Sequence, residues 1–215
     1  FGDYPTTLRA APEPGHRFAG WTLPGGVTNY APRIDRVVGS NAVEVVTARF
    51  EPIASPVVPP VRLVLSEINY HAPDDLDAGD WVEVFNPNAI AVSLGGWSLR
   101  DGSNNGVHFF PDVVLAPGAR CVVARNRAKF QLAFPNGVDP VAELPFGLDN
   151  GGDALRLFDP TGVLVESVTY DDAAPWPVAA DGGGSTLQRI DAALPAALAS
   201  SWRASPTKGG SPGGS

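Results

Sequence analysis

The densest group of potential metal ligands is the acidic run DDLDAGDWVE, residues 74–83. Carboxylate oxygens are the ligands that Ca²⁺ prefers, and a site takes about 6–8 oxygens. The odd spacing of Asp75, Asp77 and Gly79 is similar to that of a calcium loop, although the full EF-hand frame is absent. The run therefore offers a candidate Ca²⁺ site with the possible ligands Asp74, Asp75, Asp77, Asp80 and Glu83. The alternative is a solvated acidic hairpin tip without a metal.

Trp176 is the candidate ligand-binding residue. It lies between two prolines in an irregular segment, where we expect its ring to be exposed. Exposed rings are typical of surfaces that recognise sugars or proteins. A second acidic group near it in the sequence consists of Asp171, Asp172 and Asp181.

The sequence does not assemble a catalytic set. Nucleophilic catalysis needs a base beside the nucleophile, yet no G-x-S-x-G elbow accompanies His16, His71 or His108. The Gly-rich stretch at residues 182–186 lacks the lysine and helix of a phosphate loop. The single cysteine, Cys121, lies in an apolar strand-like run and is expected to be buried. We therefore expect no catalytic residue and, apart from possible Ca²⁺, no cofactor.

Composition indicates a globular chain rich in turns. Among 215 residues, 44% are hydrophobic and 18% are charged, and the 24 Gly and 22 Pro favour short strands. The net charge of −8 is concentrated in residues 61–215, which hold eighteen acidic and ten basic residues. An acidic module suits a phosphate backbone poorly, so nucleic acid is not an expected partner. No apolar stretch approaches the roughly 18 residues of a membrane helix, so membrane insertion is not expected.

A proline-rich stretch divides the chain. Residues 53–61 read as an extended linker, because closely spaced prolines exclude helix and central strand. Residues 1–52 form the first predicted module, with strands at 6–10, 16–21 and 43–50. Residues 62–215 form the second. Because the chain contains no Met, we expect a fragment or a processed product of a longer polypeptide.

The second module shows short β patterns separated by turn residues. Apolar runs at Arg62–Tyr70, Asp80–Phe85, Val92–Asp101, Val107–Phe110, Ala119–Arg125, Asp153–Phe158, Val163–Tyr170 and Ser185–Ile190 predict strands. Without a parallel βαβ rhythm, this series indicates an all-β, antiparallel β-sandwich. Helical turns are expected only at residues 124–134 and 191–199. DPTG, residues 159–162, is the clearest hairpin turn.

Alternation predicts which side chains share a face of the first strand. Leu65 and Glu67 should lie on one side and Ser66 and Ile68 on the other. Glu67, like Glu83 in the next strand, interrupts an apolar run. Such a glutamate is usually solvent-facing or hydrogen-bonded near a sheet edge, so we expect both carboxylates there rather than in a functional site.

Several segments of the second module carry a family resemblance: LVLSEINYHAP (63–73), DWVEVFNPNAIAVSLGGWSLRDG (80–102), FFPDVVLAPGARCVVAR (109–125), LDNGGDALRLFDPTGVLVESVTYDD (148–172), PWPVAADGGGSTLQRI (175–190) and SWRASPTKGGSPG (201–213). In order and spacing, residues 63–213 resemble a bacterial lamin-tail domain. The resemblance implies an immunoglobulin-like β-sandwich without agreed catalytic residues. Related nuclear lamin domains bind proteins and nucleic acid, but nucleic-acid binding is not carried over to this acidic chain.

AAPEPGHRFAGW (10–21) and VEVVTARFEP (43–52) resemble the internalin B-repeat, which implies a small β-rich spacer. Together the two resemblances imply the C-terminal part of a secreted or cell-surface CotH-like multidomain protein, with any catalytic domain before Phe1. The expected function is a non-catalytic binding or spacer module that attaches to a protein or carbohydrate surface. The alternatives are an accessory domain that completes an upstream kinase or hydrolase of the same chain, and a Ca²⁺-dependent glycan-binding module.

Overall fold

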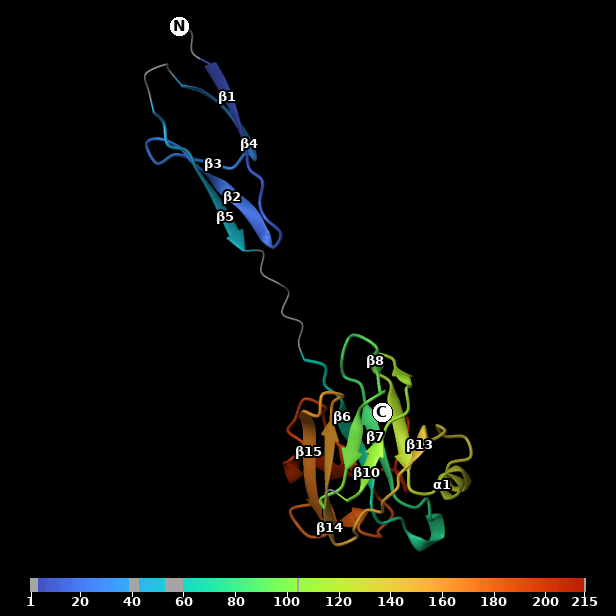
Figure 1. Cartoon of the computed structure of the whole chain (residues 1–215). Coiled ribbons are helices and arrows are strands. Elements are labelled where there is room, and N and C mark those ends of the chain that lie inside the picture. Colours follow the sequence, from blue (N-terminus) through green and yellow to red (C-terminus); the bar gives the residue numbers. More distant parts are fainter. Residues whose placement is uncertain (1–3, 39–42, 53–59, 104, 215) are drawn as a thin grey trace. The chain divides into compact units, whose positions relative to one another are not determined.

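The computed structural model describes residues 4–38, 43–52, 60–103 and 105–214 (Figure 1). The chain splits into two compact units, Phe1–Pro59 and Pro60–Ser215. Of the expected linker, residues 53–59 lie outside the described residues, and residues 60 and 61 have no regular secondary structure.

The smaller unit consists of two antiparallel sheets. Its strands are β1 (Tyr4–Arg9), β2 (His16–Thr22), β3 (Thr28–Asn29), β4 (Arg33–Val38) and β5 (Thr47–Pro52). β1 pairs with β4, and β2 lies between β3 and β5. Trp21 is buried and its Nε1 donates to the carbonyl oxygen of Ala31 at 2.9 Å. The strand predicted from residue 43 begins only at Thr47, and the sequence pattern did not predict β3 and β4.

The larger unit is a β-sandwich, as predicted. Its strands are β6 (Val64–Asn69), β7 (Trp81–Phe85), β8 (Val92–Ser93), β9 (Ser98–Arg100), β10 (Val107–Phe109), β11 (Val114–Leu115), β12 (Arg120–Ala124), β13 (Ala142–Glu143), β14 (Gly152–Phe158), β15 (Leu164–Asp171), β16 (Leu187–Arg189) and β17 (Trp202–Ala204). Its helices are α1 (Arg127–Ala133) and the 3₁₀ turns η1 (Asp74–Leu76), η2 (Val178–Ala180) and η3 (Ala199–Ser201). The two main sheets have six strands in the order β13-β12-β7-β6-β16-β17 and four in the order β10-β9-β14-β15, and β8 pairs with β11 in a separate two-stranded sheet.

The core lies between these sheets. Alternating residues of each strand point inward, because side chains of a strand alternate between its two faces. Leu155, Leu157 and Val168 from the four-stranded sheet are fully buried in one cluster with Leu65 and Val84 from the six-stranded sheet. Among the strands that the structure describes, β12 and β13 pair in parallel and the other pairings are antiparallel. The immunoglobulin-like, all-β fold class is thereby confirmed.

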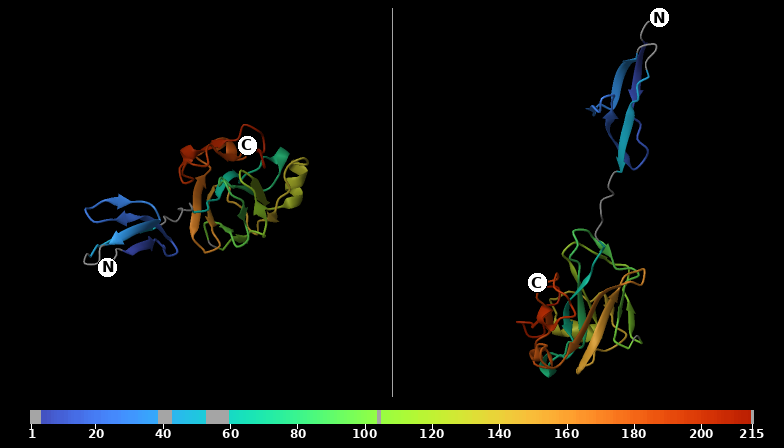
Figure 2. Two further views of the ribbon diagram at one scale, coloured as in Figure 1. Left: turned by 90° about the horizontal axis from the view of Figure 1, so that it is seen from above. Right: turned by 90° about the vertical axis from the view of Figure 1, so that its left-hand side faces the viewer.

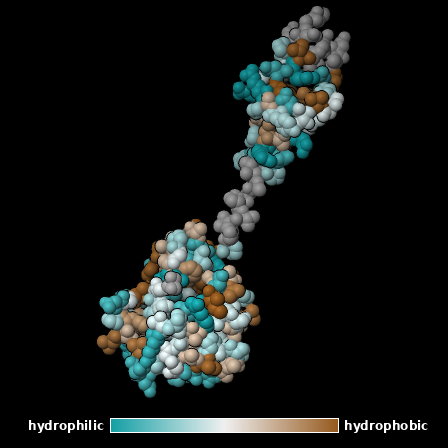
Figure 3. All heavy atoms as spheres, turned by 180° about the vertical axis from the view of Figure 1, so that it is seen from behind, coloured by the Kyte–Doolittle hydropathy of each residue, from teal (hydrophilic) through white to brown (hydrophobic). Residues whose placement is uncertain are grey.

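The outer face of the six-stranded sheet is covered. Helix α1 packs Phe130 onto Trp81 and Val122, and Asn126 caps the helix by accepting from the Lys129 backbone at 3.0 Å. The C-terminal segment, residues 205–214, lies over the neighbouring strands of the same face. Figure 2 shows this red segment and the orange strands β14 and β15 on different sides of the unit. Seen from behind, hydrophobic and hydrophilic residues are interspersed over the surface (Figure 3).

Two local predictions need correction. Residues 191–199 form turns instead of a helix, since Pro195 limits helix formation and the Asp191 carboxylate accepts from the Ala193 backbone at 2.8 Å. The run Val92–Asp101 splits into β8 and β9 around the turn at Gly95 and Gly96, where Gly96 has a φ of 84°. Among the residues that the structure describes, no helix has the length and apolar character needed to cross a bilayer.

Candidate functional site

The acidic run does not gather into a cation site. Asp75 pairs with Lys208, and Asp77 pairs with Lys129. Each lysine holds the pKa of its carboxyl partner below the ordinary value, chiefly through the hydrogen bond. The lysines come from α1 and from the C-terminal segment, so distant parts of the chain supply the positive charge that Ca²⁺ was expected to supply.

The remaining candidate ligands are also separated. The Asp80 carboxylate accepts from the Leu148 backbone at 2.9 Å, and Glu83 is buried on the outer face of the six-stranded sheet. Within residues 4–38, 43–52, 60–103 and 105–214, no three His, Cys, Asp or Glu side chains group as metal ligands would. The five residues predicted as Ca²⁺ ligands, Asp74, Asp75, Asp77, Asp80 and Glu83, therefore do not form one group in the described part of the chain.

Trp176 is not exposed. Its relative exposure is 8%, and its ring centroid lies 6.4 Å from that of Trp202. The indole of Trp202 donates to the Ala196 carbonyl at 2.8 Å, which fixes the surface on which Trp176 packs. The irregular segment around Trp176 therefore packs this ring into the core cluster. Trp81 and Trp97 are buried as well, so no tryptophan of the larger unit offers a stacking surface to a sugar.

The other groups weighed for chemistry have structural surroundings. Cys121 is buried as predicted, and burial raises the pKa of its thiol to about 12. Burial lowers the pKa of His108, which favours the neutral ring. His71 Nδ1 lies 2.6 Å from an Asp181 carboxylate oxygen.

Glu67 and Glu83 form a buried carboxylate pair at the centre of the six-stranded sheet. They lie directly opposite each other on β6 and β7, and each is 1% exposed. A β-bulge beside Ser66 shifts the register, so that Leu65 and Ile68 both reach the core. The prediction of solvent-facing or edge glutamates is therefore wrong, and the predicted face assignment fails after Leu65.

The C-terminal segment supplies hydrogen bonds to both carboxylates. Glu67 accepts from the Ser211 backbone at 3.1 Å and from the Thr186 hydroxyl. Glu83 accepts from the Gly213 backbone at 2.6 Å and from the Ser66 hydroxyl at 2.5 Å. These donors compensate the two buried charges, because a carboxylate without partners is costly to remove from water.

A hollow of about 220 Å³ adjoins the carboxylate pair. Arg120 lines it, with Nε 3.1 Å from Glu83 Oε1 and its guanidinium 4.4 Å from the ring centroid of Phe85. Arg203 also lines it and donates through Nε to the Gln188 side chain at 3.0 Å. The charged groups of the hollow thus have hydrogen-bond or ionic partners within the unit, which indicates a structural role.

The carboxylate pair predicts a distinctive pH dependence. Burial raises the pKa of Glu67 above its usual 4.5, against the opposing hydrogen bonds from Thr186 and Ser211. A carboxyl group whose pKa is higher in the folded state stabilises that state increasingly as pH falls. Relative to Glu67→Gln, the wild-type free energy of unfolding should therefore increase between pH 7 and pH 4.5. Urea denaturation of both proteins across this range measures the difference, and the opposite slope would show that hydrogen bonding outweighs burial.

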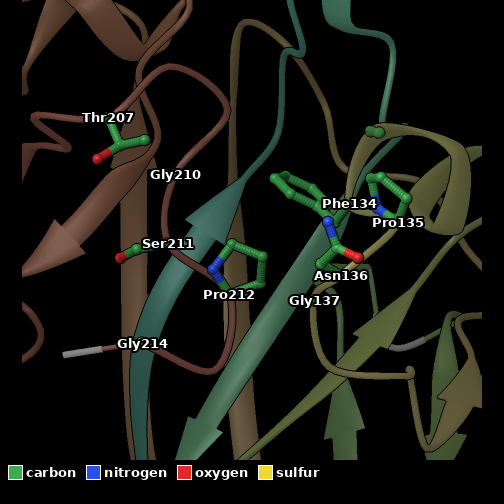
Figure 4. Close-up of a pocket in the computed structure, with 10 residues that line it drawn as sticks. Phe134, Pro135, Asn136, Gly137, Thr207, Gly210, Ser211, Pro212 and Gly214 are labelled. Atoms are coloured by element: carbon green, nitrogen blue, oxygen red, sulfur yellow. The ribbon is translucent and has the colours of Figure 1, made fainter.

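A second, more apolar groove lies beside the carboxylate pair. Its volume is about 450 Å³, and it separates the loop after α1 from the C-terminal segment (Figure 4). Phe134 and Pro135 line one side, and Ser211 and Pro212 line the other. The same residues that cover Glu67 thus form one wall of the groove.

A buried ion pair joins the two sheets. Arg189 Nη1 on β16 lies 2.8 Å from Glu166 Oε1 on β15, and the two side chains are 2% and 3% exposed. The guanidinium also lies 5.1 Å from the ring centroid of Trp202. Arg62 approaches the same carboxylate at 3.5 Å from a half-exposed position. This network fixes the sheets at the β15 side of the sandwich.

The four-stranded sheet presents a different kind of outer face, in two rows. Arg100 on β9 is the direct neighbour of Arg156 on β14. The next outward-facing row contains Ser98 of β9, which has Phe109 of β10 on one side and Phe158 of β14 on the other. Leu164 of β15 continues this row opposite Phe158. We call these residues the arginine–phenylalanine face: Arg100, Phe109, Arg156, Phe158 and Leu164.

This face is accessible. Phe109 is 67% exposed and Leu164 is 49% exposed. Both arginines and Phe158 are partly exposed. Large exposed apolar side chains beside unneutralised charge are typical of a binding surface, so this face is the candidate functional site. The sequence pattern showed each arginine within a strand, but not that the two strands are neighbours.

The lamin tail domain family matches residues 57–172. The curated proteins that were searched contain no match. Among solved structures, a DUF4876 family protein from Bacteroides thetaiotaomicron VPI-5482 is similar with a TM-score of 0.46 and 13% identity, over 75% of this chain and 70% of that one. The family match covers more than half of the chain, and the chain belongs to the lamin tail domain family.

Proposed function

We propose that this chain is a non-catalytic attachment module of a secreted or cell-surface multidomain protein. The observation that carries the proposal is the arginine–phenylalanine face, with Phe109 67% exposed at its edge. The opposite sheet uses its outward residues to hold α1 and the C-terminal segment. The outer face of the four-stranded sheet thus remains for a partner, which we propose to be a protein.

The extracellular setting is part of the proposal. It is supported by the resemblance of residues 10–52 to internalin-type spacer repeats and of the larger unit to accessory modules of CotH-like surface proteins. In this proposal the smaller unit acts as a spacer, and any catalytic domain belongs to another part of the parent polypeptide.

Binding of the 215-residue chain to intact cells of its source organism tests the proposal. Flow cytometry with labelled protein should show saturable binding, and Phe109→Asp should weaken it by at least about ten-fold, since an aromatic anchor of an interface often contributes that much. Leu132→Asp is the matched control, because Leu132 is 84% exposed on α1. Equal loss in both variants, absence of binding, or hydrolysis or phosphotransfer by the chain alone would contradict the proposal.

A further inference from the structure

We infer that the arginine–phenylalanine face binds an extended acidic polypeptide segment in which a carboxylate residue is followed two positions later by an apolar residue. This inference rests on the proposed attachment function and specifies the chemistry of the partner. It derives from the charges of the face, the unused donors of the two arginines and the spacing of the rows.

The charges of the face differ from those of the rest of the unit. Residues 61–215 hold eighteen acidic and ten basic residues, yet Arg100 and Arg156 lie directly opposite each other on paired strands. Like charges in this position repel. Neither guanidinium has a carboxylate within 4.0 Å among the residues placed by the structure. A carboxylate from a partner would relieve the repulsion.

The nearest acidic side chains are engaged elsewhere. Asp101 accepts from the Ser103 hydroxyl at 2.9 Å. Asp153 accepts from the backbone of Gly102 at 3.2 Å and from that of Ala154 at 2.7 Å. Both carboxylates thus hold the loop at the end of β9, which leaves the arginines for another anion.

The arginines are also positioned for a ligand. The guanidinium of Arg100 lies 4.4 Å from the ring centroid of Phe158, which orients it over the apolar row. Arg156 donates through Nη2 to the Asp101 carbonyl. The Nε of each arginine is buried and has no acceptor within the described part of the chain, so it is not presented to a ligand. A ligand would meet the outer Nη groups instead, because both side chains are partly exposed and the planar fork of Arg suits a carboxylate.

The distance between the two rows predicts the spacing of the contacting residues in the partner peptide. Arg156 and Phe158 are two residues apart on one strand, which corresponds to about 6.5–7 Å. Alternate side chains of an extended peptide have the same separation. A peptide that follows the strands can therefore place a carboxylate over Arg100 and Arg156, and its next sheet-facing side chain against the row that contains Phe158.

The peptide is favoured over other anions. A sulfated or carboxylated sugar carries no large apolar group to cover Phe109 and Leu164, which are 67% and 49% exposed. A nucleic acid would meet the net charge of −8 of the chain. The apolar row suits leucine-like or aromatic side chains, which a polypeptide supplies.

Fluorescence anisotropy with the full chain tests the inference. The probe is a labelled dodecapeptide of three Glu-Thr-Leu-Thr repeats, and the register control has three Glu-Leu-Thr-Thr repeats of the same composition. We expect the first peptide to bind more tightly than the second, and added NaCl to weaken its binding. Arg100→Gln/Arg156→Gln and Arg156→Gln alone should each weaken binding by about ten-fold or more. Arg127→Gln is the control, since Arg127 lies on α1, pairs with Asp139 and has a side chain that is 43% exposed.

The outcomes separate this inference from the proposed function. Near-ultraviolet circular dichroism verifies that each variant is folded. Equal affinity for the two peptides, or unchanged binding by folded arginine variants, would overturn the inference. Binding of a heparin fragment but not of the peptide would overturn it as well. If Phe109→Asp still abolishes cell binding in any of these cases, the attachment function stands and only the acidic-peptide partner is rejected.

Discussion

Replacement of Arg189 by Met should lower the free energy of unfolding by about 3–5 kcal/mol, the range typical of a broken buried ion pair. The substitution removes the cation from Glu166 while the carboxylate stays buried at 3% side-chain exposure. It also removes the stacking partner of Trp202. Burial already raises the pKa of Glu166, so without Arg189 the carboxyl group should become protonated at a still higher pH. Guanidinium denaturation at pH 7 measures the loss of stability.

Two further variants distinguish the ion pair from simple loss of packing. Arg189→Met/Glu166→Leu should recover much of the lost stability, because replacing both charges with apolar groups is often neutral or better. Arg62→Gln should cost no more than about 1 kcal/mol, since Arg62 approaches the same carboxylate from a side chain that is 41% exposed. If Arg189→Met/Glu166→Leu were as unstable as Arg189→Met alone, the loss of stability would come from packing around Trp202 and not from the ion pair.

Local sequence patterns predicted much of the sandwich. The DPTG turn joins β14 and β15, with Phe158 opposite Leu164, because turn residues and flanking apolar runs act over a few positions. The helical turn expected at residues 124–134 is found as α1, and its cap lies within the same stretch. The turn and the helix cap depend on residues a few positions away, so a local sequence pattern is enough to predict them.

The candidate site depends on long-range pairing that no local pattern encodes. Arg100 and Arg156 are neighbours only because β9 pairs with β14, although β10 to β13 lie between them in the sequence. Glu67 is buried because Ser211, 144 positions later, donates to it. The lysine partners of the acidic run could not be predicted for the same reason, since Lys129 and Lys208 reach it from distant elements. Charge density in a sequence does not reveal which cations the fold brings nearby.

Deletion of residues 211–215 should lower the free energy of unfolding by about 2–4 kcal/mol, from a cost of about 1–3 kcal/mol for each buried group that loses its partner. The deletion removes the Ser211 and Gly213 backbone donors and leaves Glu67 and Glu83 facing each other across β6 and β7. Water can replace some of these donors, which limits the loss. Urea denaturation at pH 7 gives the measurement.

The matched control for this deletion removes only residues 214–215 and keeps every one of those donors. Its stability should equal that of the full chain. Glu67→Gln in the shortened chain should recover part of the loss, because one of two opposed charges disappears. If the chains that lack residues 211–215 and 214–215 had the same free energy of unfolding, the contact of the C-terminal segment with the sheet would not stabilise the fold. The closing hydrogen bonds to the carboxylate pair would then contribute nothing to the fold, and the cost of two buried, adjacent charges would have to be compensated by Arg120 and the hydroxyls of Ser66 and Thr186.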